Sequence, residues 1–184
     1  MKKLLIVLVA GSFLTSCGTL SSEEKKGLSQ VEKIERGKYL VTIGGCHDCH
    51  TPKVFGPQGP ALDTNRLLSG YREGSSLPPY DSSIAKSGWA LMGMEGTSMV
   101  SPVGVSFSAN ITSDETGIGS WTFEQFKKAF TKGRYKGLDN TRPLLPPMPW
   151  QNYKHMPEED VESIFLYLKS TKPVRNIVPV AKMN

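Results

Sequence analysis

The feature that most constrains what this chain can fold into is the sequence Cys46-His47-Asp48-Cys49-His50. Two thiols three positions apart lie on one face of a helical turn, where both can form thioethers with vinyl groups along one edge of a porphyrin. The histidine that follows directly can then point its imidazole at the iron as an axial ligand. The spacing therefore predicts one covalently attached haem c, bound through Cys46, Cys49 and His50, with the rest of the chain folded around it.

Two other kinds of site use paired cysteines at this spacing. A thioredoxin-type dithiol is expected next to a βαβ pattern, which this sequence lacks, and the histidine after the second cysteine argues against it. A zinc site needs a second pair of ligands, and of the three histidines only His155 lies outside the motif. Both alternatives are therefore weaker than the haem interpretation.

The first residues predict export and lipid attachment. A short basic start, Met1-Lys2-Lys3, precedes an apolar run over residues 4–14, which is too short to span a bilayer comfortably. Residues 14–17 (LTSC) resemble the lipobox of bacterial lipoproteins, so we expect residues 1–16 to be a signal peptide and Cys17 to be lipidated. The alternative is an ordinary signal peptide with Cys17 present by chance. Residues 17–30 have the composition of a flexible tether, which leaves 31–184 as the haem domain.

Charge gives little information about partners. The formal net charge is +5, and without Lys2 and Lys3 the remaining 20 basic and 17 acidic residues leave +3. The chain has no dense basic stripe interleaved with aromatic residues, so we expect no nucleic-acid partner.

Iron held by one histidine needs a second axial ligand, or it stays open for chemistry. Among the seven methionines, Met148 is distinctive because prolines surround it in residues 145–149 (LPPMP). Proline restricts the backbone, so the segment is expected to be stiff and extended. From spacing alone, Met148 is equally well explained as a core residue in a proline-rich turn, and Met99 is the other candidate ligand.

The helical pattern is clearest near the two ends of the haem domain. We expect a first helix over about residues 30–44, with Gly37 permitting close approach of another helix, and a last helix over about 157–169. These two helices are expected to cross near Tyr167. A middle helix should begin at Thr122 and end at Gly133. Residues 53–105 show no sustained period, so they predict a long irregular region with one short helical piece near 81–89.

Several segments, in order along the chain, resemble class I mono-haem cytochromes c, and most closely the cytochrome c domains in the cytochrome subunits of bacterial alcohol and aldehyde dehydrogenases. They are RGKYL (36–40), GCHDCHTP (45–52), NITSD (110–114), TGIGSWT (116–122), LPPMP (145–149) and PVRN (173–176). The similarity runs from about residue 34 to 180. Those subunits usually carry three haem domains, whereas this chain has one C-x-x-C-H motif.

The resemblance implies an all-α class I cytochrome c fold, with about three to five helices around one haem and a long irregular loop region. It implies His50 and Met148 as the axial iron ligands. Asn110 and Trp121 are expected to contact the haem, as donors to its propionates, although each could equally serve packing. Gly59-Pro60 is expected to offer a backbone carbonyl to Nδ1 of His50.

The function that follows is electron transfer rather than catalysis by the chain itself. We expect a membrane-anchored carrier on the periplasmic side of the bacterial envelope. Its redox partners would be a dehydrogenase, a quinol-oxidising complex or a terminal oxidase. The alternatives are a haem subunit docked in a membrane dehydrogenase or oxidase complex, and a haem protein with an open sixth position for catalysis or gas sensing.

Overall fold

The computed structural model describes residues 27–184. The predicted signal peptide (1–16), Cys17 and most of the predicted tether lie outside the described residues. Within residues 27–184, no helix is both long enough and apolar enough to cross a membrane.

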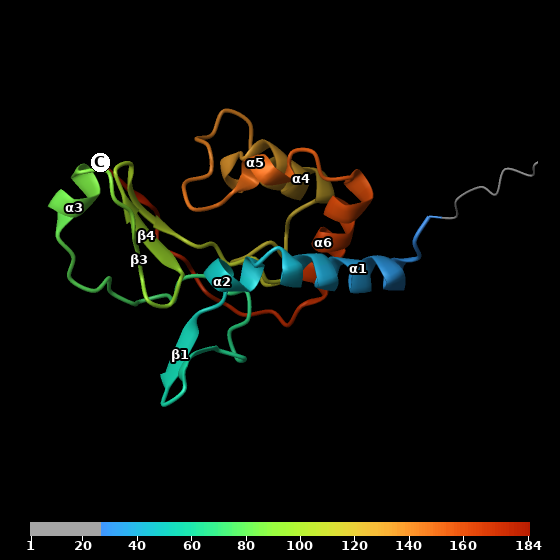
Figure 1. Ribbon diagram of the computed structural model, residues 1–184. Coiled ribbons are helices and arrows are strands. Elements are labelled where there is room, and N and C mark those ends of the chain that lie inside the picture. The colour runs from blue at the N-terminus through green and yellow to red at the C-terminus, as the bar shows by residue number, and fades with distance from the viewer. Residues whose placement is uncertain (1–26) are drawn as a thin grey trace, which may run out of the picture.

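The two longest helices lie side by side in the half of the molecule where the described chain begins (Figure 1). Helix α1 (Gln30–Ile43) begins with a capping box, in which the Ser29 hydroxyl accepts from the Glu32 amide and the Glu32 carboxylate accepts from the Ser29 amide. Helix α6 (Glu158–Ser170) crosses it at Gly37, where an added Cβ would lie 1.9 Å from the Ser163 carbonyl oxygen and 2.8 Å from Cβ of Tyr167. The predicted crossing, with Gly37 and Tyr167 at the contact, is confirmed.

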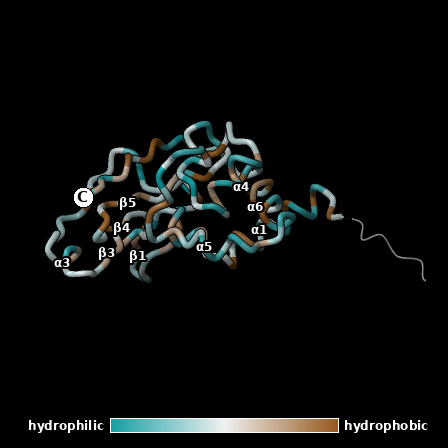
Figure 2. The backbone as a smooth tube through the Cα atoms, turned by 90° about the horizontal axis from the view of Figure 1, so that it is seen from above, coloured by the Kyte–Doolittle hydropathy of each residue, from teal (hydrophilic) through white to brown (hydrophobic). Residues whose placement is uncertain are grey.

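Helix α4 (Phe123–Lys132) is the third helix, after α1 and α6, that contributes side chains to the main core. Its boundaries match the prediction, because the Thr122 hydroxyl accepts from the Gln125 amide and Gly133 ends the helix at φ +63°. What we call the main core is a cluster of buried side chains from these helices and the connecting segments: Val41, Leu68, Ile118, Phe126, Phe130, Val161, Ile164, Phe165 and Leu168. Figure 2 shows hydrophobic stretches of α4 and α6 gathered in this half.

The prediction of an all-α fold is wrong, because residues 27–184 contain two antiparallel sheets as well as six α-helices. Strands β1 (Lys53–Gly56) and β2 (Gly59–Leu62) form a hairpin. Strands β3 (Leu91–Met92), β4 (Ser98–Ser101), β5 (Gly104–Phe107) and β6 (Lys182–Met183) pair in that order as a second sheet. The fold is therefore mixed α and β.

All strands except β6 lie within residues 53–107, almost entirely in the region predicted as a long loop, and their shortness explains the error. None is longer than four residues, so alternation of polar and apolar side chains has no room to show a period. Buried backbone groups must nevertheless find partners, and pairing of short strands provides them. The helix expected near 81–89 is present as α3 (Ser82–Lys86), capped by the Asp81 side chain.

Two further short helices raise the number of α-helices above the predicted range. Helix α2 (Cys46–His50) contains the C-x-x-C-H motif, and α5 (Trp150–Tyr153) follows the proline-rich segment. A 3-10 turn covers Tyr135–Gly137. Figure 1 shows α2 between the end of α1 and the four-stranded sheet, so the motif lies where the helical half meets the sheet.

Candidate functional site

Helix α2 presents the two cysteines of the motif from a single turn. Gly45 precedes it in the left-handed conformation, at φ +65°, which lets the chain turn sharply out of α1. Cys46 and Cys49 are both half-buried and neither is in a disulfide. Cys46 also packs against the main core.

Burial controls the protonation of both thiols. It raises the pKa of Cys46 to about 11, and it is the main cause that raises the pKa of Cys49, with the Asp48 carboxylate adding to it. A dithiol oxidoreductase needs a cysteine whose pKa is lowered, because the thiolate is the nucleophile. The environment of α2 therefore argues against the thioredoxin-type alternative.

His50 is held in the tautomer that a metal ligand requires. Its Nδ1 lies 2.8 Å from the backbone carbonyl oxygen of Ala109, to which it can donate, and Nε2 has no hydrogen bond to any residue in 27–184. Burial lowers the His50 pKa, while the bond to Ala109 opposes this shift. The expectation that Gly59-Pro60 supplies this carbonyl is wrong, because those residues belong to strand β2 of the exposed hairpin.

Asn110 fixes the segment that carries this carbonyl. Its Nδ2 donates to the Val174 carbonyl (2.8 Å) and to Oγ1 of Thr116 (3.0 Å), and its Oδ1 accepts from the amide and the hydroxyl of Thr112. The side chain is buried and has protein partners for both of its polar atoms. Contact between Asn110 and the haem stays a prediction; the geometry gives the residue a second role, holding Ala109 beside His50.

Met148 lies in a turn rather than in the extended segment that its prolines predicted. The Met148 amide donates to the Leu145 carbonyl oxygen (3.3 Å), and the peptide between Pro146 and Pro147 is cis. Ser106 of β5 donates its hydroxyl to the Pro146 carbonyl at 2.6 Å, so the sheet holds this turn from one side. The Met148 side chain packs against the main core, as does that of Cys46.

Helix α5, which begins two residues after Met148, packs against α4. Tyr153 of α5 packs against the main core, as do Met148 and Cys46, and burial raises the pKa of its hydroxyl. The Tyr153 ring stacks on Phe130 of α4 with 4.4 Å between ring centroids. Met148, the helix that follows it and Cys46 of α2 therefore all contact the main core.

Trp121, predicted to contact the haem, and Met99, the alternative iron ligand, differ in their surroundings. Trp121 is half-buried and packs against the main core, close to the start of α4, and its contact with haem stays a prediction. Met99 lies in β4, paired with Met92 on one side and with Ser106 on the other, and is not part of the main core. Because Ser106 reaches the Met148 turn, Met99 is one strand away from it and remains the alternative ligand.

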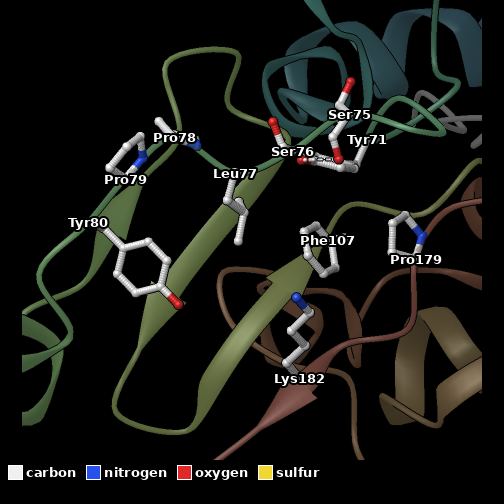
Figure 3. Close-up of a pocket in the computed structure, with 10 residues that line it drawn as sticks. All are labelled: Tyr71, Ser75, Ser76, Leu77, Pro78, Pro79, Tyr80, Phe107, Pro179 and Lys182. Carbon is white, nitrogen blue, oxygen red and sulfur yellow. Dashed lines mark hydrogen bonds between the residues drawn. The ribbon is translucent and has the colours of Figure 1, made fainter.

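Outside the haem motif, residues 27–184 offer little that resembles a second site. They contain no group of three or more His, Cys, Asp or Glu side chains arranged to hold a metal ion. A hollow of about 510 Å³ opens beside the sheet, lined by Tyr71, Leu77, Tyr80, Phe107, Pro179 and Lys182 among others (Figure 3). None of the residues predicted for the haem site lines it.

Three residues that contact the predicted site segments were missed from the sequence. Ala109 acts through its backbone carbonyl, which no side-chain pattern reveals. Ser106 contacts a segment 40 residues away, whereas Lys53 contacts carbonyls at the end of α2 from two to six residues away and the Glu95 carbonyl from 42 residues away. The only local signal was the position of Lys53, three residues after His50 and just beyond the end of α2.

Known proteins similar to this chain are subunits of bacterial dehydrogenases, although no protein-family model matches it. The fructose dehydrogenase cytochrome subunit of Gluconobacter japonicus is 30% identical over 172 residues, covering 92% of this chain and 27% of its own length. The gluconate 2-dehydrogenase cytochrome c subunit of Pantoea cypripedii is 28% identical over 152 residues (82% and 25%). The cytochrome c subunit of the quinone-dependent alcohol dehydrogenase of Gluconobacter oxydans is 28% identical over 143 residues (77% and 22%).

The chain therefore spans about a quarter of the length of these relatives. The matches cover most of this chain and agree with the resemblance seen in its motifs. The protein is a homologue of the cytochrome c subunits of bacterial dehydrogenases, which are electron-transfer subunits rather than catalytic enzymes.

Proposed function

We propose that this protein is a membrane-anchored electron carrier of the periplasm that uses one haem c. Cys46 and Cys49 would form the thioethers, and His50 and Met148 would be the axial ligands. When bound, the haem supplies reversible one-electron transfer between its ferrous and ferric states. Lipid on Cys17 would hold the domain at the membrane, and a dehydrogenase is the favoured electron donor.

The observation that carries the proposal is the hydrogen bond between His50 and Ala109. Because Nδ1 is occupied by the carbonyl at 2.8 Å, the imidazole offers Nε2, in neutral form, to a metal. Two free thiols lie on the same short helix, three positions apart and held protonated by burial. These donors fit a porphyrin attached at its edge and coordinated at its iron.

Met148 supports the carrier interpretation over an open sixth position. Met148 would supply a thioether to the iron in addition to the His50 imidazole, which would favour the reduced state and would leave no open position for oxygen or substrate. The turn that holds Met148 is fixed at both ends, by the Ser106 hydroxyl and by α5 packing on α4. A ligand on such a restrained segment loses little conformational entropy when it binds the metal.

The dehydrogenase partnership rests on the relatives, since the cytochrome subunits among them belong to fructose, gluconate and alcohol dehydrogenases. This chain matches a stretch of about a quarter of their length, as one haem domain of a larger subunit would. We therefore favour a carrier or subunit that accepts electrons from such a dehydrogenase, with a quinol-oxidising complex or a terminal oxidase as the other partners.

Spectroscopy of the protein produced with a cytochrome c maturation system tests the ligands. We expect haem that survives denaturation in the wild type and no covalent haem in the double variant Cys46→Ala, Cys49→Ala. The oxidised wild type should show the weak sulfur-to-iron band in the far red, which Met148→Ala loses and Met99→Ala keeps. Ready binding of carbon monoxide by the reduced wild type would instead favour the open-site alternative.

A further inference from the structure

Lys53 makes an unusual set of contacts next to the haem motif. It is the first residue of β1, and its ammonium donates to the carbonyl oxygens of His47 (3.1 Å), Asp48 (2.9 Å) and Thr51 (2.6 Å). These carbonyls form the end of α2, where the last peptide groups of a helix lack intrahelical partners. Lysine side chains satisfy such carbonyls and place positive charge at the negative end of the helix.

The same ammonium reaches across to the second sheet. It contacts the carbonyl oxygen of Glu95, at 3.4 Å, in the turn between β3 and β4. The turn also touches α2 directly, because a Cβ added to Gly96, which has φ +75°, would lie 2.4 Å from the Asp48 carbonyl oxygen. Arg72 completes the contact, with its guanidinium 3.2 Å from the Glu95 carboxylate and 3.3 Å from the Lys53 carbonyl.

The charge on Lys53 is only partly exposed to water. The side chain is half-buried, and this burial lowers its pKa, against the opposing effect of the Asp48 carboxylate. Charges withdrawn from solvent are screened less by salt and act more strongly on their neighbours. Lys53 therefore holds a partly desolvated positive charge, with the Asp48 and Glu95 carboxylates nearby, against the helix that carries Cys49 and His50.

We propose that Lys53 is a positioning residue of the haem site, which fixes the end of α2 against the sheet and raises the reduction potential of the haem. This inference rests on the proposed attachment of haem to α2. A positive charge disfavours the ferric state more than the ferrous state, because the ferric centre carries one more positive charge. Removing the charge should therefore stabilise the oxidised protein.

Redox titration of four variants tests this role. Lys53→Met removes the charge and the donors, Lys53→Gln keeps an amide donor without charge, and Lys53→Arg keeps both. Lys86→Met is the matched control, because Lys86 is an exposed lysine on α3, at the far end of the sheet (Figure 1). We expect lower potentials in the two neutral variants at both low and high salt, and potentials near the wild type in Lys53→Arg and Lys86→Met.

The outcomes separate this inference from the proposed function. Absence of covalent haem in the wild type contradicts the proposed function itself. If the neutral variants retain haem and their reduction potential equals that of the wild type, the role of Lys53 is overturned. The role is also overturned if the reduction potential of Lys53→Arg falls by as much as that of the neutral variants. If the neutral variants fail to retain haem while Lys53→Arg retains it, the positioning part of the proposal is supported.

Discussion

At the residue scale, Asn176 joins the segments that lie next to His50. Its Oδ1 accepts from the Arg66 guanidinium and the Glu73 amide, both at 2.8 Å, and its Nδ2 donates to the carbonyls of Ser69 (2.7 Å) and Tyr71 (2.8 Å). The residue is completely buried. Asn176 therefore joins the tail after α6 to the loop whose Gly70 amide donates to the His50 carbonyl at 2.7 Å.

Truncating this amide should destabilise the protein strongly. Asn176→Ala leaves several buried polar groups without partners, and each such group costs about 1–3 kcal/mol, so we expect the free energy of unfolding to fall by roughly 2–4 kcal/mol. Urea denaturation measures the change. Asn152→Ala, at an exposed position of α5, is the control and should change it by less than about 0.5 kcal/mol. Equal effects of the two substitutions would contradict the structural role of Asn176.

At the element scale, β5 and the Met148 turn are joined by one strong contact, the 2.6 Å hydrogen bond from Ser106 to the Pro146 carbonyl. The sheet was absent from the expected fold, so this support for the proposed sixth ligand was also unexpected. Together with the contact between Lys53 and Glu95, in the turn between β3 and β4, it joins the four-stranded sheet to both segments that carry proposed iron ligands.

Ser106→Ala should loosen the Met148 turn. Loss of one hydrogen bond is worth about 0.5–1.5 kcal/mol, so imidazole should displace the thioether from the oxidised haem roughly 2–10-fold more readily. Titration with imidazole, followed by loss of the far-red band, measures this. Ser101→Ala is the control, because the Ser101 hydroxyl bonds within its own hairpin to Gly104. Unchanged displacement in Ser106→Ala would show that the turn holds Met148 without the sheet.

At the scale of the whole molecule, the structure has two hydrophobic clusters of unequal size. The main core unites α1, α4 and α6, whereas the sheet buries a much smaller cluster of Ala85, Val100 and Val105. Figure 1 shows the sheet and α3 at the end opposite to the start of α1. Since hydrophobic burial is the main stabilising contribution, the sheet should be the less stable half.

Amide hydrogen exchange followed by mass spectrometry tests this difference. Peptides from β3–β5 should exchange through local opening at lower free energy than peptides from α6, and they should do so without loss of the haem spectrum. Haem should protect α2 and the Met148 turn more than α3, which packs beside the sheet. Simultaneous exchange of the sheet and α6 would instead show one cooperative unit.

The sequence by itself determined the longer helices and the kinds of side chain that the candidate site contains. Helix α4 could be placed from Thr122 and Gly133, and the crossing of α1 with α6 from Gly37, because caps and apolar stripes depend on residues within a few positions of one another. The thiols and the imidazole of α2, and the prolines around Met148, could likewise be identified from short stretches of neighbouring residues.

Only the tertiary structure decided which segments surround these groups. The sheet depends on pairing between strands of two to four residues, including β6 with β5 from far along the chain, and such pairing leaves no period in the sequence. The carbonyl beside His50 and the hydroxyl beside Pro146 come from residues 59 and 40 positions away, and Lys53, at the end of α2, also contacts Glu95, which is 42 positions away. Contacts of this range depend on the folded chain as a whole, because no local propensity specifies them.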